Sequence, residues 1–295
     1  MNWKTATPRR LAQAFLSGAI LLAASGPGWA RPLITEEVAT NGRFMFETGF
    51  ALSQRTDSFG DPRSTLETSY FPFHAKLGLS DNIDLNLLFE YSGQRLDSNG
   101  ARLSGSQLGM FSPSLKYMIS PYFGVMGIFH LKQPQREGQE LPIARGNDLE
   151  ALALFKAPFS WPLHLNVGYV RRANYRSNFG IASALPSTVE PGNIFESMAS
   201  LEIPLGSHFS LLDEMAYYRF ASEKVAGDTV LDTSGRAWDE FAGLTWAYKG
   251  WDIGAAVGFG LLDKAHSSAD LTRGAGDTDY RLSVSYKLTP HRPEQ

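Results

Sequence analysis

The feature that most constrains the fold is a long alternation of apolar and polar side chains that recurs along the chain. In the stretch 80–91, SDNIDLNLLFEY, the apolar side chains fall at every second position: they are Ile83, Leu85, Leu87, Phe89 and Tyr91. Because the side chains of a β-strand point alternately to its two faces, this spacing predicts a strand with one apolar and one polar face. The apolar face could pack against a protein core or contact membrane lipid, so the rest of the sequence must decide.

Twelve stretches of this kind follow one another from Gly42 to Leu288, and the connectors between them alternate in length. The short connectors are 80–82, 120–121, 160–162, 206–207 and 249–250, and the long polar ones are 55–64, 95–104, 134–146, 174–191, 221–235 and 264–276. The strands would have roughly 10–14 residues, whereas strands of soluble domains usually have about 5–6.

Transmembrane barrels combine long strands with short periplasmic turns and longer extracellular loops, and their closed sheet leaves no polar edge in the lipid. A soluble sandwich, the alternative, has no physical reason to sort its connectors by length. We therefore expect an all-β fold: a membrane-spanning, up-and-down antiparallel β-barrel of about 12 strands with short periplasmic turns and long extracellular loops.

Residues 1–30 have the composition of a secretory signal peptide. Lys4, Arg9 and Arg10 form a positive n-region, the apolar run LAQAFLSGAILLAA follows, and small residues precede a cleavage site after Ala30. An amphipathic helix or a membrane anchor is the alternative interpretation. We expect four parts: the signal peptide (1–30), a periplasmic N-terminal segment (31–41), the outer-membrane barrel (42–288) and a C-terminal tail (289–295).

If the apolar faces of the strands contact lipid, their polar faces line the lumen. The candidate lumen-lining residues are Glu47, His74, Lys76, Asp84, Asn86, Glu90, Lys116, His130, Lys132, Glu150, Lys156, His164, Glu196, Glu202, Asp252, Arg281 and Lys287. Acidic and basic side chains occur among them in similar numbers. They could pair into a network that stiffens a narrow barrel, or they could line a pore that selects solutes by size and polarity more than by charge sign.

Two stretches leave their local arrangement open. In 208–220, HFSLLDEMAYYRF, the adjacent Asp213 and Glu214 cannot both face the lumen of a regular strand, so we expect a β-bulge or a position near a loop. In 254–260, the inward positions carry only glycine and alanine. This bare wall could relieve strain where the barrel curves, or it could leave space for a solute, a loop or the N-terminal segment.

No catalytic, metal or cofactor site is predicted from the sequence. The chain has no cysteine, and its 6 histidines are dispersed without the spacing of metal ligands. His208 and Ser210 would share one strand face, similar to the His-x-Ser pair of an outer-membrane phospholipase, but they adjoin a short turn and no orienting third residue can be named. The net charge of −3 gives no basic surface for a nucleic acid. We expect a protein that is not an enzyme.

The stretch 31–50, RPLITEEVATNGRFMFETGF, resembles the N-terminal signature of a family of outer-membrane proteins named after the MetA pathway of phenol degradation. The shared features are an Arg-Pro-Leu start, the cluster of Thr35, Glu36 and Glu37, and a first strand that begins with Gly42 and contains Glu47. The resemblance implies a transporter-like outer-membrane barrel that passes small aromatic or hydrophobic compounds.

The expected function is therefore passive uptake of small, aromatic or hydrophobic molecules through an outer-membrane channel. A structural or adhesive surface barrel that acts through its extracellular loops is the alternative, and a phospholipase-like enzyme comes third. The expected partners are outer-membrane lipids, a small-molecule solute, the barrel assembly machinery and periplasmic chaperones, but no nucleic acid.

Overall fold

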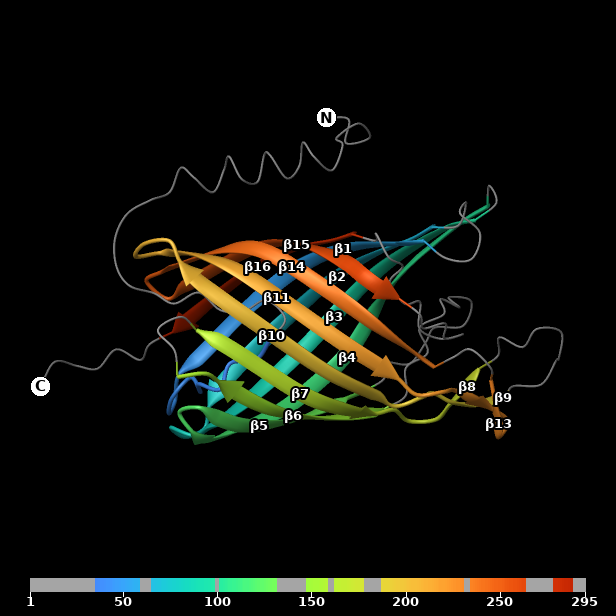
Figure 1. The fold of residues 1–295 in the computed structure, drawn as a ribbon, viewed down its shortest axis with the longest axis horizontal. Helices are drawn as coiled ribbons and strands as arrows, with labels where there is room; N and C mark the ends of the chain where they lie inside the picture. Colours follow the sequence, from blue (N-terminus) through green and yellow to red (C-terminus); the bar gives the residue numbers. More distant parts are fainter. Residues whose placement is uncertain are drawn as a thin grey trace, which may run out of the picture.

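The computed structural model describes residues 35–58, 65–98, 101–131, 147–158, 162–177, 187–230, 234–263 and 278–288. They form a closed antiparallel barrel of twelve strands (Figure 1). The barrel strands are β1 (Phe46–Ser58), β2 (Thr65–Gly78), β3 (Ile83–Ser98), β4 (Ala101–Ser120), β5 (Phe123–His130), β6 (Asp148–Lys156), β7 (Leu163–Arg171), β10 (Ile194–Pro204), β11 (Phe209–Phe220), β14 (Gly235–Tyr248), β15 (Trp251–Asp263) and β16 (Thr278–Leu288). Pairing of β1 with β16, from Phe46 opposite Leu288 to Thr56 opposite Thr278, closes the sheet.

The apolar faces of the strands point outward and the polar faces point into the barrel. In β3, Phe89 and Tyr91 are 46% and 47% exposed, whereas Asp84 and Asn86 are buried. A soluble sandwich would bury the apolar face, so this orientation excludes it and confirms the expected membrane-spanning barrel. No helix in the described part of the chain is long and apolar enough to cross a membrane, a finding that concerns helices alone.

Aromatic side chains gather on the outer surface near the short turn between β14 and β15. The rings of Trp251 and Tyr286 lie 4.7 Å apart, and those of Trp246 and Tyr248 lie 5.8 Å apart. Amphipathic rings of this kind are favoured at the level of lipid headgroups. The cluster therefore marks one membrane boundary of the barrel, at the end that carries the short turns.

The other end of the barrel differs from the expected arrangement of long loops. The stretch 95–104 is expected to be a loop, but β3 and β4 continue as a paired hairpin until Ser98 lies opposite Ala101. The stretches 174–191 and 221–235 contain four short strands, β8 (Tyr175–Ser177), β9 (Ser187–Glu190), β12 (Lys224–Val225) and β13 (Asp228–Thr229). These pair into a separate sheet beyond the barrel wall (Figure 1). Polar strands of two to four residues carry too little alternation to be recognised in a sequence.

The bulge expected at Asp213 and Glu214 is wrong. β11 pairs in uninterrupted register with both β10 and β14, and the irregularities of the sheet lie elsewhere, for example between Trp238 and Asp239. Glu214 is fully buried inside the barrel, and Asp213 is exposed on the outer face within β11. In this regular strand Glu214 points into the barrel, and Asp213 points outward to the lipid.

Replacing Asp213 with leucine is expected to stabilise the barrel by about 1 kcal/mol, because an acidic side chain on the lipid face is unfavourable, though less so than a basic one. The free energy of unfolding is measured by denaturant titration of the barrel in lipid vesicles. Asp213→Asn is the control, since it removes the charge but stays polar and should give a smaller gain. A loss of stability in Asp213→Leu would mean that the carboxylate makes a favourable contact.

The bare inner wall of β15 is covered by a ring from the neighbouring strand. Phe241 lies opposite Gly258, is only 2% exposed, and would overlap a Cβ atom at that glycine. The guanidinium of Arg281 lies 4.3 Å from the centre of the same ring. At Gly258, the space considered for a solute, a loop or the N-terminal segment is therefore occupied by Phe241.

We expect Gly258→Val to lower the free energy of unfolding by about 1–3 kcal/mol, because it overpacks the contact with Phe241. In a Phe241→Ala background the loss caused by the valine should shrink, since the ring is gone. Gly127→Val is a matched control, because a Cβ atom at Gly127 meets nothing within 4 Å. Equal losses at the two glycines, measured by denaturant unfolding, would contradict the role of Phe241.

Candidate functional site

Residues 35–41, here named the N-terminal plug, lie inside the barrel at the end that carries the short turns. The hydroxyl of Thr40 donates to the carbonyl of Asp81 in the turn between β2 and β3 (2.6 Å), which marks the level at which the plug enters. From the sequence, 31–41 is expected as a periplasmic segment, and its entry into the lumen beside 254–260 is left open. Residues 35–41, the part of this segment that the structure describes, are bonded to strands of the barrel wall other than β15.

The inner end of the plug is held by side chains of β7, β10 and β11. The backbone amide of Thr35 donates to Glu214 Oε1 (3.1 Å), and the hydroxyl of Thr35 donates to Ser200 Oγ (2.8 Å). The amide of Glu36 donates to Asn166 Oδ1 (2.6 Å), while Asn166 Nδ2 donates back to the carbonyl of Glu36 (2.9 Å). Asn166 thus pairs with Glu36 as a neighbouring strand would, so the backbone amide and carbonyl of Glu36 are satisfied without joining the sheet.

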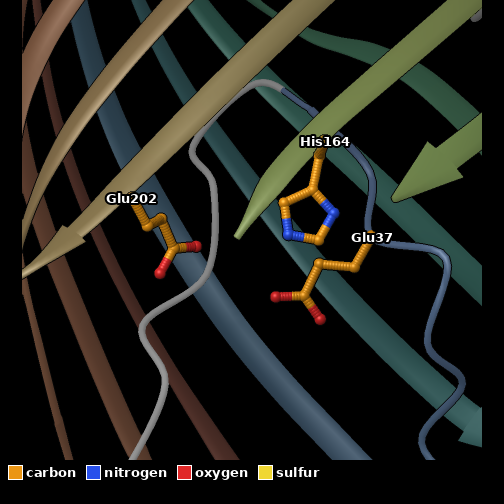
Figure 2. A group of neighbouring side chains, drawn as sticks. All are labelled: Glu37, His164 and Glu202. Carbon is orange, nitrogen blue, oxygen red and sulfur yellow. The ribbon is translucent and has the colours of Figure 1, made fainter. Parts of the chain in front are cut away.

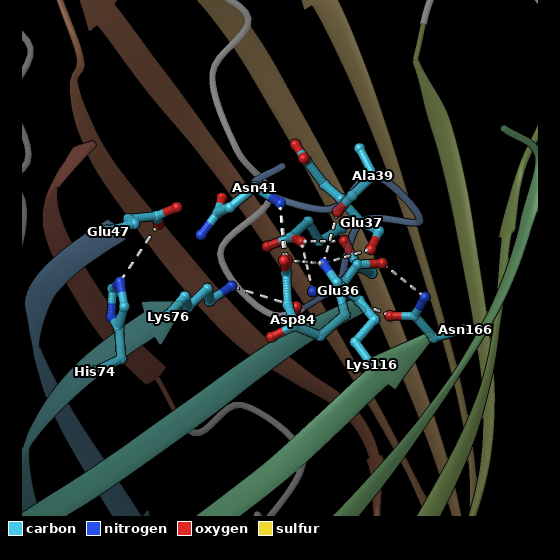
Figure 3. Close-up of polar contacts among 12 residues, drawn as sticks. Glu36, Glu37, Ala39, Asn41, Glu47, His74, Lys76, Asp84, Lys116 and Asn166 are labelled. Carbon is cyan, nitrogen blue, oxygen red and sulfur yellow. Dashed lines mark hydrogen bonds and ion pairs between the residues drawn. The ribbon is translucent and has the colours of Figure 1, made fainter. Parts of the chain in front are cut away.

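Charged side chains of β3 and β4 hold the outer half of the plug (Figure 3). Lys116 Nζ donates to the carbonyls of Ala39 (2.6 Å) and Glu37 (3.2 Å) and lies 3.6 Å from Asp84 Oδ2. The Asp84 carboxylate accepts the amide of Asn41 at 2.9 Å and 3.1 Å. The side chains of Lys116 and Asp84 are 3% and 1% exposed, so this ion pair is buried by the plug that it binds.

One apolar contact completes the binding of the plug. Val38 is fully buried and belongs to a cluster of inward-facing apolar side chains: Met126, Leu152, Leu154, Met198 and Ala216. A sequence signal for this contact exists in β6, where the run 149–155, LEALALF, is apolar on both faces. A strand of this kind in a barrel needs an apolar partner inside the lumen, and the plug supplies it.

The chain leaves the plug through a tight turn before β1. Gly42 has a positive φ of 86°, and the amide of Phe44 donates to the carbonyl of Gly78 (2.8 Å). A Cβ atom at Gly78 would overlap the carbonyl group of Gly42. Glycine at both positions therefore lets the turn lie directly against β2.

The structure buries or partly buries every predicted lumen-lining residue that it describes. The buried ones are Glu47, Asp84, Asn86, Lys116, His164, Glu196 and Glu202; the partly buried ones are His74, Lys76, Glu90, His130, Glu150, Lys156, Asp252, Arg281 and Lys287. Lys132 lies outside the described residues. That these side chains line a path for solutes stays a prediction.

These residues fall into a group at the plug and groups elsewhere on the wall. At the plug, Lys76 Nζ lies 3.3 Å from Glu36 Oε2. Away from it, His130 Nε2 lies 2.8 Å from Glu150 Oε2, and His74 Nε2 lies 3.5 Å from Glu47 Oε1. The charges are thus at least partly paired, as in the first of the two interpretations drawn from the sequence.

His208 and Ser210 are both buried, His208 in the turn before β11 and Ser210 within the strand. His208 Nδ1 bonds to the carbonyl oxygen of Ala247 (3.1 Å), and its ring packs edge-on against Tyr248. These contacts hold the imidazole in the wall at the turn between β10 and β11.

Sequence reasoning missed the residues that bind the plug from the wall or belong to it. They are Thr35, Val38, Asn166, Ser200 and Glu214. Asn166 and Glu214 are inward-facing polar residues of the type already singled out, but their partners are backbone groups far away in the sequence. Only the closed barrel brings them to residues 35–41.

No protein-family model and no curated protein matches this chain, so the resemblance of 31–50 to the phenol-degradation family stays a prediction. Solved structures do match. The COG4313 outer membrane channel from Pseudomonas putida F1 matches with a TM-score of 0.65 and 11% identity, over 87% of this chain and 100% of that one. The translocator domain of the autotransporter NalP from Neisseria meningitidis gives 0.55 and 11%, over 97% and 99%, and the β domain of the Bordetella autotransporter BrkA gives 0.52 and 12%, over 83% and 100%.

At these identities the likeness concerns the fold alone. The matched chains are covered almost completely, so the likeness includes the whole barrel and is not limited to a few strands. The chain is therefore a twelve-stranded β-barrel with the fold of outer-membrane proteins, and its lumen contains a segment of its own N-terminal region.

Proposed function

We propose that this protein is an outer-membrane channel through which small solutes diffuse passively, and that the N-terminal plug narrows its lumen. The observation that carries the proposal is the plug itself. Its segment is held mainly by hydrogen bonds to polar side chains of the wall, with one apolar contact at Val38. When the plug leaves, water can replace these hydrogen bonds and can also solvate the charges of Lys116 and Asp84, so the plug is suited to move and open the lumen.

Three further features support a channel of narrow bore. Twelve strands lie between the eight-stranded barrels, which hold at most a small ligand, and the porins with 16–18 strands, which have an aqueous channel. The mixed charges of the wall suit selection by size more than by charge sign. The P. putida F1 protein of similar fold is described as an outer membrane channel, and it matches over its whole length.

The class of solute that we propose is small aromatic or hydrophobic compounds. The support is the resemblance of 31–50 to the phenol-degradation family, which now acquires a structural meaning because the plug lies within this stretch. Val38 and its apolar cluster add an apolar surface inside the lumen, which such solutes could contact once the plug moves.

The test is single-channel recording with the refolded chain in planar bilayers, combined with swelling of liposomes in small sugars and small aromatic acids. We expect discrete conductance steps and faster swelling with the aromatic acids than with sugars of similar size. Absence of both conductance and swelling, even from a chain that lacks the plug, would reject the channel. Equal swelling rates for the two solute classes would reject the solute preference only.

One observation favours the alternative of a structural or adhesive surface barrel. The sheet of β8, β9, β12 and β13 stands beyond the barrel wall, where it could contact another surface (Figure 1). Replacement of residues 187–190 and 224–229 by short Gly/Ser linkers separates the two functions. If conductance persists and cell adhesion is unchanged, the alternative fails.

A further inference from the structure

We propose that Glu37, His164 and Glu202 form a binding site for a divalent transition-metal ion of the zinc type, which fastens the plug to the barrel wall. One ligand atom of each residue lies within 4.8 Å of the others. Glu37 belongs to the plug, His164 to β7 and Glu202 to β10, and the three side chains point toward one another (Figure 2). The proposal goes beyond the channel function and does not depend on it.

Two of the three side chains have buried polar atoms that are left without a partner. His164 and Glu202 are 3% and 1% exposed, and neither His164 Nδ1 nor Glu202 Oε2 has a hydrogen-bond partner within the described residues. Buried polar atoms of native proteins are nearly always bonded, and an unpaired one is costly. Figure 2 shows His164 Nε2 on the side of the ring that faces the two carboxylates, so an ion there would bind Nε2 and would provide the missing partner of Glu202 Oε2.

The charges around Glu202 also favour a cation. Two carboxylates, those of Glu37 and Glu202, converge there with ligand atoms within 4.8 Å of each other. A divalent ion supplies two positive charges at the point where Glu37 and Glu202 converge. It would turn a repulsive contact between plug and wall into an attractive one.

The donor set indicates the class of metal. One imidazole nitrogen with two carboxylate oxygens suits zinc, which binds three protein ligands and keeps a fourth position open for water. Calcium takes 6–8 oxygen ligands and magnesium usually keeps several waters, so neither suits a site that includes a histidine. Ligand atoms at about 2.0–2.2 Å from zinc lie about 3.4 Å apart in a tetrahedron, so small rotations of the two glutamate side chains would close the site.

A metal held in this way would couple ion concentration to the position of the plug. Only the docked plug brings Glu37 to the two wall residues, so binding stabilises the docked state by mass action. An ion at 100 times its dissociation constant for the docked state would shift the equilibrium toward docking by about a hundredfold. Loss of any one of the three ligands removes most of this shift.

The first experiment is calorimetric titration of ZnCl₂ into the refolded full-length barrel in detergent. We expect one saturable zinc site per barrel, with affinity lowered at least tenfold in His164→Ala, Glu202→Gln and Glu37→Gln, and no binding of Mg²⁺ or Ca²⁺. His208→Ala is the matched control, because it removes another buried histidine and should keep the zinc site. If the two wall variants fold poorly, Glu37→Gln still tests the proposal, since Glu37 lies outside the sheet.

The second experiment measures hydrogen exchange of the backbone amides of residues 35–41 with and without zinc. Zinc should slow their exchange in the wild-type barrel but not in Glu37→Gln. This measurement does not involve conductance, so its failure is distinguishable from failure of the channel. The proposal is overturned if wild type binds no zinc saturably, if the Glu37, His164 and Glu202 variants bind it as tightly as wild type, or if bound zinc leaves the exchange unchanged.

Discussion

A chain that begins at Gly42 is expected to conduct severalfold more current than the chain that retains residues 35–41. The reason is geometric, because the plug reaches from the turn between β2 and β3 to Glu214 and contacts strands on several sides of the lumen. The barrel itself closes through β1 and β16 and does not include the plug in its sheet. The measurement is single-channel conductance in planar bilayers with symmetric salt.

The control for this deletion replaces residues 35–41 by a Gly/Ser segment of equal length. This variant keeps the chain length but loses the contacts of Thr35, Val38 and Asn41, so its conductance should fluctuate and approach that of the shortened chain. Heat-modifiable migration in gel electrophoresis verifies that each barrel is folded. Unchanged conductance after the deletion would mean that the plug does not narrow the path.

The second large effect is expected from Lys116→Met, which breaks the buried contact between the plug and the wall. The variant removes the donor to the carbonyls of Glu37 and Ala39 and leaves Asp84 without its cation. Breaking a buried ion pair by removing one partner costs about 3–5 kcal/mol, because the remaining charge stays desolvated. Release of the plug lets water reach Asp84, so the cost should appear mainly as a plug that leaves the lumen.

Lys116→Met should therefore conduct like the chain that begins at Gly42, and hydrogen exchange at residues 35–41 should become fast. Lys76→Met is the matched control, because its ion pair with Glu36 is more exposed, with side chains 16% and 28% accessible. Fully exposed pairs contribute only about 0.2–1 kcal/mol, and the loss of this partly exposed pair should cost less than the loss of the buried one. Adding Asp84→Asn to Lys116→Met should restore part of the docking. If the two lysine variants changed conductance and hydrogen exchange equally, the contacts of Asp84 and Lys116 would not be the main ones that hold the plug.

The strands, and the side to which each of their side chains points, are determined by local sequence. This is why they could be predicted. Alternation between residues such as Phe89 and Glu90 depends only on the geometry of one strand, and lipid outside the barrel tolerates few polar groups. The same reasoning correctly places Asp84, Lys116 and His164 inside. It failed at Asp213, where the expected bulge is absent, because pairing with β10 and β14 maintains a regular strand despite one unfavourable side chain.

The sequence by itself thus determined a twelve-stranded barrel with apolar residues outside and charges inside. The tertiary structure alone decided what those charges do. The plug lies at a place set by strand order and register, which bring Glu214, Asn166 and Lys116 around residues 35–41. Glu37, His164 and Glu202 likewise meet only because the sheet closes. Alternation is a property of neighbouring residues, whereas these contacts join residues whose separation in the chain carries no periodic signal.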